Sequence, residues 1–161
     1  GVPFQFDIFG SGPLKDALEA QIRGQGLQDR MALCGVLDFD TGWIPYLREQ
    51  ADLFVCCHPQ GDPSSTYPEV MSCGVPIAGY DNEAFRGIVR ESRGGWVTPM
   101  FDAATLAGTI ARLHANRDEI AEAATRARDF ARRHVFEATF ANRAAHLVRV
   151  SRLPGALKAG L

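Results

Sequence analysis

The chain of 161 residues is long enough for one domain with a sizeable hydrophobic core and too short for two ordinary domains. Seventeen basic and 19 acidic side chains give a net charge of -2, without a block of like charge, so we expect no nucleic-acid partner. No apolar run approaches the roughly 20 residues that cross a bilayer, and residues 1–10 lack the pattern of a signal peptide. A soluble, cytoplasmic protein is therefore expected.

Hydrophobic periodicity predicts strands that alternate with helices. The predicted strands span residues 4–9, 31–34, 53–57, 75–80 and 94–97. Helices are predicted around Leu14, Leu18 and Ile22 and over 41–51, 67–73 and 83–90. Three further helices carry apolar stripes: Leu106, Ile110 and Leu113; Ile120, Ala124, Ala127 and Phe130; and Phe136, Phe140, Ala144 and Leu147. The tail 151–161 carries little apolar weight and is expected to fray.

Alternating strands and helices predict an α/β domain over residues 1–150, with a Rossmann-like parallel sheet and helices on both faces. The carboxyl ends of parallel strands meet at one edge, where such sheets bind ligands. Four segments that follow strands should gather along this rim: the loop Gly10–Pro13, the pair Gly35-Val36, the loop 58–66, and Tyr80–Asn82.

The four cysteines are expected to be reduced thiols. Cys34, Cys56 and Cys57 lie in apolar, strand-like runs, where small buried thiols are common. His58 follows two of these cysteines directly, which raises the question of a metal site. Adjacent strand residues point to opposite faces, however, and no C-x-x-C spacing is present, so we predict no metal site.

The helix start after residue 63 gathers polar groups that can bind a diol or a phosphate. Glu69 has a carboxylate that can accept two hydrogen bonds from a vicinal diol such as a ribose, or that simply compensates the helix dipole. Ser64, Ser65 and Thr66 offer hydroxyls and backbone N–H groups of the kind that receive phosphate, and Ser65 or Thr66 would also make an ordinary N-cap. His58 suits either a substrate hydrogen bond or a bond to a loop carbonyl.

Several catalytic motifs are absent from the sequence. The glycine loop Gly10–Pro13 is not a G-x-G-x-x-G fingerprint, and there is no P-loop, no G-x-S-x-G elbow and no pair of carboxylates at metal-ligand spacing. Nucleophilic hydrolysis and kinase chemistry are therefore disfavoured.

The order FGSGPLKDAL, CGVLD, ADLFVCCHPQGDPSSTYPEVMSCGVPIAGYDN and GGWVTPMFDAATLAGTIARL resembles the C-terminal, donor-binding domain of a retaining glycosyltransferase with the GT-B fold. The family is family four, also called glycosyltransferase group 1. The resemblance covers about residues 4–150, and its most specific part is EVMSCGVP, similar to the family's E-A-M-A-x-G-x-P.

The resemblance implies residue roles. The second glutamate of the family's E-x7-E motif, which binds the nucleotide ribose, corresponds to Glu69. The first glutamate, which contacts the donor sugar, falls on Gly61, and Asp62 is the nearest carboxylate to replace it in a catalytic role. Backbone amides of Ser64–Thr66 would hold the pyrophosphate and sugar. The remaining residues assigned to the nucleotide sugar are Gly10, Ser11, Gly12, Gly35, Val36 and His58.

The resemblance also implies what lies beyond this chain. The family's basic phosphate clamp, which follows the first strand of the domain, has no counterpart here, and residues 1–10 correspond to a later strand. The first βα unit and the N-terminal acceptor domain are therefore expected outside this chain. A sheet edge left exposed beside Phe4–Phe9 would favour self-association.

The expected function is to bind a nucleotide diphosphate sugar whose sugar is transferred, with retention, to an acceptor hydroxyl, without a cofactor. The isolated chain should bind the donor rather than catalyse. A full-length parent would be cytoplasmic and peripheral to a membrane. Two alternatives remain open: a non-catalytic nucleotide or sugar-phosphate binding module, which Gly61 permits, and a sugar-nucleotide epimerase on the same architecture.

Overall fold

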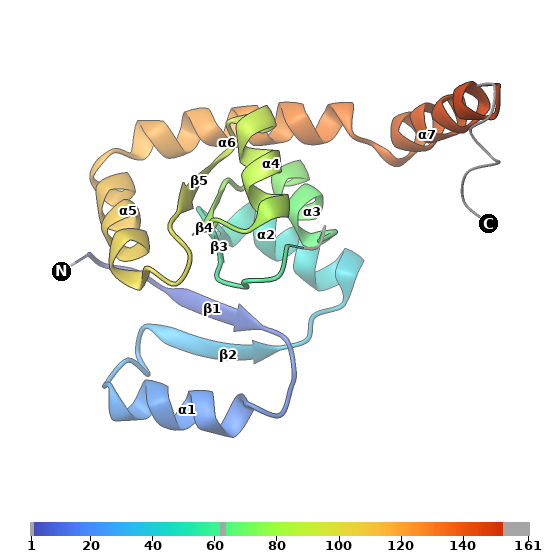
Figure 1. Cartoon of the computed structure of the whole chain (residues 1–161). Coiled ribbons are helices and arrows are strands. Elements are labelled where there is room, and N and C mark those ends of the chain that lie inside the picture. Colours follow the sequence, from blue (N-terminus) through green and yellow to red (C-terminus); the bar gives the residue numbers. More distant parts are fainter. Residues whose placement is uncertain (1, 62–63, 153–161) are drawn as a thin grey trace.

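The computed structural model describes residues 2–61 and 64–152 and contains two parallel sheets (Figure 1). Strand β1 (Phe6–Phe9) pairs with β2 (Met31–Gly35) in the first sheet. The second sheet has the order β3-β4-β5 and consists of β3 (Phe54–Cys56), β4 (Ile77–Tyr80) and β5 (Gly95–Thr98). The predicted α/β fold with parallel strands is confirmed, with strand bounds that differ by at most two residues.

Helices connect and follow the strands, and none within residues 2–61 and 64–152 is long and apolar enough to cross a membrane. Their bounds are α1 Lys15–Gly24, α2 Ile44–Gln50, α3 Thr66–Ser72, α4 Glu83–Ser92, α5 Ala103–Ala115, α6 Arg117–Arg133 and α7 Phe136–Ser151. The predicted frayed tail falls outside the described residues from residue 153 onward.

The predicted helix over residues 41–51 begins differently. A π-helical turn, η1 (Phe39–Trp43), precedes α2, and Asp38 caps it by accepting a hydrogen bond from the Thr41 N–H at 2.8 Å. Pro45 lies in the first turn of α2, where the lack of an N–H removes no helical hydrogen bond.

The hydrophobic core lies between the sheet β3-β4-β5 and its helices, with the long helix α6 lying across α3 (Figure 1). The largest apolar side chains of this core are Leu47, Tyr67, Val70, Met71, Ile77, Phe85 and Phe130. Burying each such side chain contributes about 1.5–3 kcal/mol. Gly94 allows α6 to approach closely, since a Cβ at this position would lie 2.8 Å from the Cα of Ala127. This half of the molecule is therefore tightly packed.

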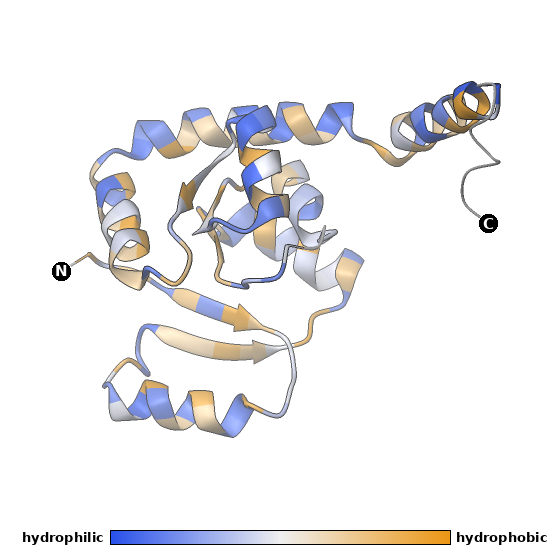
Figure 2. Cartoon of the chain, viewed as in Figure 1, coloured by the Kyte–Doolittle hydropathy of each residue, from blue (hydrophilic) through white to orange (hydrophobic). Residues whose placement is uncertain are grey.

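The sheet β1-β2 is covered far less well. All four residues of β1 are only half-buried, although Figure 2 shows β1 and β2 as mainly hydrophobic strands. Of the apolar face predicted for the following helix, Ile22 is buried, whereas Leu14 precedes α1 and is 67% exposed and Leu18 is 37% exposed. No described element packs over that side of α1, so the predicted apolar face is only partly buried.

The expected burial of two cysteines was wrong. Cys34 and Cys57 are exposed, because Cys34 lies on the thinly covered strand β2 and Cys57 follows the end of β3. The stripe on α7 is also uncovered: Phe136, Phe140 and Leu147 are exposed, since the helix extends away from the rest of the chain (Figure 1). Periodicity marks an apolar face but does not say whether another element covers it.

Candidate functional site

The structure brings the predicted rim segments together. The Gly10 N–H donates to the Gly35 carbonyl at 2.7 Å, which joins the loops after β1 and β2. Gly10 has φ of 139°, a conformation that glycine adopts readily and that turns the chain out of β1. Gly10, Val36 and Thr66 line one cavity of about 1220 Å³, so three of the four rim segments face the same space. Ser11, Gly12 and Val36 are exposed.

A hydrogen bond between a side chain and the backbone, across two residues, holds the loop before α3. The Ser64 hydroxyl oxygen accepts a hydrogen bond from the Thr66 N–H at 3.3 Å, whereas Ser65, at the N-cap position, makes no capping bond. Ser65 already has helical backbone angles (φ -63°, ψ -25°), and a capping side chain needs an extended backbone to reach the free N–H groups. The prediction that Ser65 or Thr66 caps this helix was therefore wrong, and Ser64 takes that part.

Glu69 lies in the first turn of α3 and is half-buried. Its backbone carbonyl accepts bonds from the Ser72 hydroxyl at 2.7 Å and the Cys73 N–H at 3.3 Å. Its carboxylate has neither a hydrogen bond nor an ion pair with another described residue, so both oxygens are available to a ligand. A first-turn position also suits the helix dipole, so the alternative stated above stays compatible with the geometry.

His58 is engaged through both nitrogens of its ring. Nδ1 lies 3.3 Å from Cys56 Sγ, and Nε2 lies 2.9 Å from the Tyr67 hydroxyl, which also contacts Cys56 Sγ at 3.2 Å. The rings of His58 and Tyr67 are stacked, with centroids 5.7 Å apart. These contacts join the end of β3 to α3, so the imidazole supports the base of the loop. Its predicted contact with the nucleotide sugar is left as a proposal.

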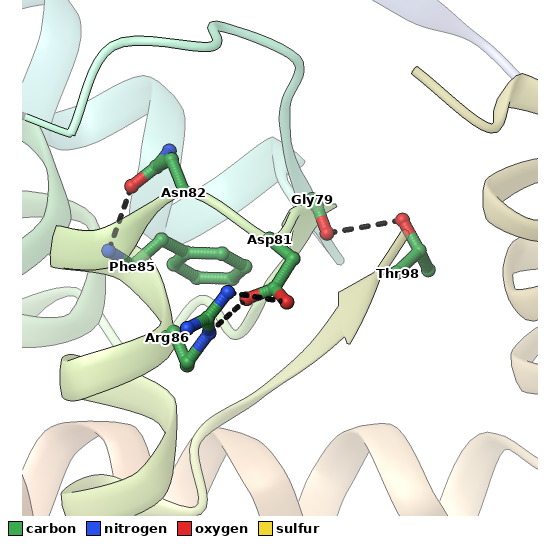
Figure 3. A network of polar contacts seen from close by, with 6 residues as sticks. All are labelled: Gly79, Asp81, Asn82, Phe85, Arg86 and Thr98. Carbon is green, nitrogen blue, oxygen red and sulfur yellow. Dashed lines mark hydrogen bonds and ion pairs between the residues drawn. The ribbon is translucent and has the colours of Figure 1, made fainter. Parts of the chain in front are cut away.

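Asn82 extends this buried network to β4 and α4. Its Oδ1 accepts from the Phe85 N–H at 2.9 Å (Figure 3). Its Nδ2 donates to the His58 carbonyl at 3.3 Å and to the Tyr67 hydroxyl at 3.2 Å. Only 2% of Asn82 is exposed, so these partners replace water completely. Sequence reasoning placed Asn82 on the rim but missed its capping role, although a polar residue directly before a predicted helix is a recognisable N-cap signal.

The neighbouring rim residue Asp81 forms a hydrogen-bonded ion pair with Arg86. Figure 3 shows the paired contacts, Nε to Oδ1 at 2.5 Å and Nη2 to Oδ2 at 2.7 Å. These hydrogen bonds from Arg86 hold the pKa of Asp81 below its usual value. Figure 3 also shows Thr98 Oγ1 donating to the Gly79 carbonyl at 3.1 Å, which ties β5 to β4. The rim at β4 is thus built around internal bonds.

Gly61, where the family pattern has a glutamate, lies beside another carboxylate. A Cβ at Gly61 would lie 3.3 Å from the Cβ of Glu83 and 3.8 Å from its Oε2. Glu83 begins α4 and is exposed. Sequence reasoning missed Glu83 because 22 positions separate it from Gly61. Asp62, the predicted substitute, lies outside the described residues.

The described residues offer no obvious metal centre. No group of three or more His, Cys, Asp or Glu side chains in the described part of the chain is placed to hold a metal ion. Cys56 and His58 are in contact, but the third partner in their cluster is the Tyr67 hydroxyl and not a further His, Cys, Asp or Glu side chain. The rim therefore offers hydroxyls, backbone amides and carboxylates, which suit the diol and phosphate groups of a ligand.

Comparison with known sequences finds similarity to glycosyltransferases. Residues 2–116 match the profile of the family described as "Glycosyl transferases group 1". The chain is 28% identical over 101 residues to the 2-deoxystreptamine N-acetyl-D-glucosaminyltransferase of Streptomyces fradiae, a match that covers 63% of this chain and 24% of the relative. It is 27% identical over 109 residues to the alpha-D-kanosaminyltransferase of Streptomyces kanamyceticus, covering 68% and 28%. The matched segments are thus about a quarter of each relative.

Solved structures show the same fold. The sucrose-phosphate synthase of Thermosynechococcus elongatus superposes with a TM-score of 0.77 at 20% identity, covering 90% of this chain and 38% of that one. Anabaena HepE in complex with UDP superposes with a TM-score of 0.76 at 20% identity, covering 91% and 41%. These structures confirm the predicted Rossmann-like part of a GT-B fold. The family profile matches well over half of the 161 residues of this chain, so the chain belongs to the glycosyl transferases group 1 family.

Proposed function

We propose that this chain is the donor-binding domain of a retaining glycosyltransferase, which transfers a sugar from a nucleotide diphosphate sugar to an acceptor hydroxyl. One observation carries the proposal: the carboxylate of Glu69, unpaired among the described residues, lies in the same first turn of α3 as Thr66, three residues earlier, and Thr66 lines one cavity with Gly10 and Val36. Two solved structures with this fold are of HepE, in complex with UDP and with UDP-glucose, which supports a nucleotide sugar as the ligand.

Each part of the donor has a proposed partner. Glu69 accepts hydrogen bonds from the ribose hydroxyls, and the amides of Ser64–Thr66 hold the diphosphate. The loop Gly10–Gly12 borders the nucleotide, and Gly35-Val36 lies against its base. His58 contacts the donor from a position held by Cys56 and Tyr67. The domain thereby supplies orientation and stabilises the charge that develops on the leaving diphosphate.

Two carboxylates are candidates for the donor-sugar contact that the family assigns to position 61. Asp62 is adjacent in sequence, and Glu83 is adjacent in space to Gly61. If either one holds the sugar, replacing it with its amide should weaken the binding of UDP-glucose and leave the binding of UDP unchanged. Comparing Asp62→Asn with Glu83→Gln by calorimetry therefore identifies the sugar-binding carboxylate.

The acceptor side of the reaction is proposed to come from an N-terminal acceptor domain of a full-length parent, located in the cytoplasm at a membrane surface. The isolated chain should then bind donor without transferring sugar. A non-catalytic nucleotide-binding module is the second candidate, favoured by glycine at position 61. Consumption of donor by the full-length parent decides between them, because a binding module would consume none.

Glu69→Gln tests the ribose contact. Loss of charge-assisted bonds worth ~1.5–3 kcal/mol should weaken UDP binding by roughly 10- to 150-fold in calorimetric titrations. Inorganic pyrophosphate is the control ligand, because it has no diol, and its affinity should stay the same. Glu137→Gln is the control variant, since Glu137 is also a first-turn acid, at α7.

The helix-dipole alternative for Glu69 predicts a different result. If Glu69 only compensates the helix dipole, Glu69→Gln should lower the free energy of unfolding by ~0.3–1 kcal/mol and leave UDP affinity unchanged. Urea melts of both variants measure this difference. An equal loss of affinity for UDP and for pyrophosphate would contradict the ribose assignment.

A further inference from the structure

Phe101 is a large apolar side chain held at the surface in a left-handed backbone conformation. It has φ of 62°, and 72% of it is exposed. Among the described residues other than glycine, Arg93 alone shares a positive φ with it. A residue with a Cβ adopts this region at an energetic cost, because its Cβ approaches the following carbonyl oxygen. Because the ring is mostly exposed, burial in the core does not offset this cost at Phe101.

A turn and a helix cap hold Phe101 in this conformation. The Asp102 N–H donates to the Pro99 carbonyl at 3.1 Å, which closes a turn of four residues with Phe101 at its third position. A type II turn has a positive φ at that position, where glycine is the usual residue. Asp102 then caps α5, since its carboxylate accepts from the Thr105 N–H at 2.9 Å and from the Thr105 hydroxyl at 2.6 Å. Strain that the surrounding bonds maintain is a physical reason to look for a function of the ring.

Tyr80 forms an aromatic pair with Phe101 at the carboxyl edge of the sheet β3-β4-β5. Tyr80 ends β4, and its ring centroid lies 6.2 Å from that of Phe101, with the ring planes tilted by 55°. The strand register pairs Tyr80 with Thr98, the last residue of β5. Neither ring lines the 1220 Å³ cavity to which Gly10 and Thr66 contribute. The two rings, here called the aromatic ledge, therefore belong to the rim but lie outside that cavity.

Polar groups of fixed orientation follow Tyr80 along the rim. Asp81 is the next residue, and two hydrogen bonds from Arg86 hold its carboxylate (Figure 3). The side chain of Arg86 is 60% exposed, and its Nη1 has no hydrogen bond or ion pair with a described residue. The Asp81 carboxylate can accept further bonds, because two oxygens offer about four lone-pair sites. The rim next to the ledge thus has both hydrogen-bond donors and acceptors.

This combination of groups suits the ring of a sugar. One face of a sugar ring presents aliphatic C–H groups, which can pack against the negative face of an aromatic ring. Its hydroxyls need donors and acceptors of the kind that Arg86 and Asp81 offer. A nucleobase fits less well, because a base held between two rings needs them parallel and about 7 Å apart. The ring planes of the ledge are instead tilted by 55°.

We propose that the aromatic ledge binds a sugar ring of the acceptor. Phe101 and Tyr80 pack against the C–H face of this ring, and the pair Asp81–Arg86 forms hydrogen bonds with its hydroxyls. The assignment to the acceptor rests on the proposed function, in which the donor occupies the cavity that the ledge lies outside. The backbone strain at Phe101 then has a reason, since glycine would relieve the strain but would remove the ring.

The binding test uses simple sugars and no nucleotide. Methyl glycosides of glucose, galactose, mannose and N-acetylglucosamine are titrated into the full chain, and carbon–proton NMR follows the rings of Phe101 and Tyr80. At least one sugar should shift the signals of both rings. Phe101→Gly should weaken the binding of that sugar by about 5- to 30-fold, the factor given by about 40–80 Å² of apolar surface that is no longer removed from water. Phe101→Trp keeps an aromatic ring and should retain binding.

A matched control separates the sugar contact from backbone strain. Phe101→Gly and Arg93→Gly each place glycine at a positive φ, so both should raise the urea midpoint of unfolding. Arg93 follows α4 and precedes β5, at the end of that strand opposite Phe101, so Arg93→Gly should leave sugar binding unchanged. Phe140→Ala, which removes an exposed ring from α7, should also leave it unchanged. A merely structural Phe101 would show the gain in stability without the loss of sugar binding.

Three results would overturn the proposal. The first is that none of the four sugars shifts the signals of either ring. The second is that UDP or UDP-glucose shifts them while no methyl glycoside does, because the ledge would then belong to the donor site. The third is that Phe101→Gly binds the sugar as tightly as the unmodified protein. A chain that binds a sugar at the ledge but does not bind UDP would contradict the donor-binding proposal and leave this one standing, so the two failures are distinguishable.

Discussion

The buried amide of Asn82 should be worth more to stability than an ordinary helix cap. Its side chain joins three segments: it caps α4 through the Phe85 N–H, and it donates to the His58 carbonyl and the Tyr67 hydroxyl. Asn82→Ala removes all three bonds at a position that is 2% exposed, where water cannot easily replace them.

The expected loss follows from the geometry of each bond. The cap, at 2.9 Å, is worth about 1 kcal/mol. The two bonds from Nδ2 are longer, 3.3 and 3.2 Å, so we assign each about 0.5–1 kcal/mol, the lower part of the usual range. Asn82→Ala should therefore lower the free energy of unfolding by about 2–3 kcal/mol. Asn82→Ser keeps an oxygen for the cap but loses both donors, so its loss should be about 1–2 kcal/mol.

Urea melts followed by circular dichroism measure both variants. Asp102→Ala is the reference for a cap without a buried network, because Asp102 caps α5 at the surface by accepting from the Thr105 N–H at 2.9 Å. Asn82→Ala should be more destabilising than Asp102→Ala. If Asn82→Ser is as stable as the unmodified protein, the two Nδ2 bonds contribute nothing and the reasoning is refuted.

Two further predictions concern packing and pH. Gly94→Ala should lower the free energy of unfolding by about 1–3 kcal/mol in urea melts, because its Cβ would lie 2.8 Å from the Cα of Ala127. Gly87→Ala in α4, where nothing lies within 4 Å of an added Cβ, should raise the free energy of unfolding by about 0.5–1 kcal/mol. Equal effects of the two variants would contradict the close approach of α6. Hydrogen bonds from Trp96 Nε1, at 2.8 Å, and from Arg112 hold the pKa of Glu119 below its usual 4.5. The ionised carboxylate therefore stabilises the fold above pH 4.5, and this stabilisation is lost as the pH falls through the lowered pKa. Glu119→Gln should be less stable at neutral pH, and thermal melts should show the gap to the unmodified protein closing in acid; a gap constant from about pH 7 to about pH 3 would rule this out.

The order of strands and helices was predictable because most elements carry a strong local signal. The predicted runs 4–9, 53–57 and 75–80 are short and flanked by glycine, proline or polar residues, which is typical of strands in a parallel sheet. The family resemblance rested on such a local signal too, the segment around Glu69, and the profile match confirms it.

Burial was less predictable, because it depends on elements distant in sequence. Leu18 and Phe140 have the spacing of buried positions, yet both are exposed where no described element packs over them. Capping by Ser64 rather than Ser65 was also missed. The choice depends on Ser65 having helical backbone angles, which residue types alone do not determine.

The departure at Gly61 shows why a site cannot be completed from sequence spacing alone. Spacing along the chain leads from Gly61 to Asp62, the next carboxylate. The fold adds Glu83 as a second candidate, because β3 and β4 are neighbouring parallel strands and the segments after them meet at one rim. Asn82, one residue earlier, donates to the His58 carbonyl and so holds the two segments together. Hydrogen bonding between strands β3 and β4 therefore places the carboxylate at the start of α4 beside the loop after β3. The spacing of residues 58–69 along the chain does not indicate this proximity.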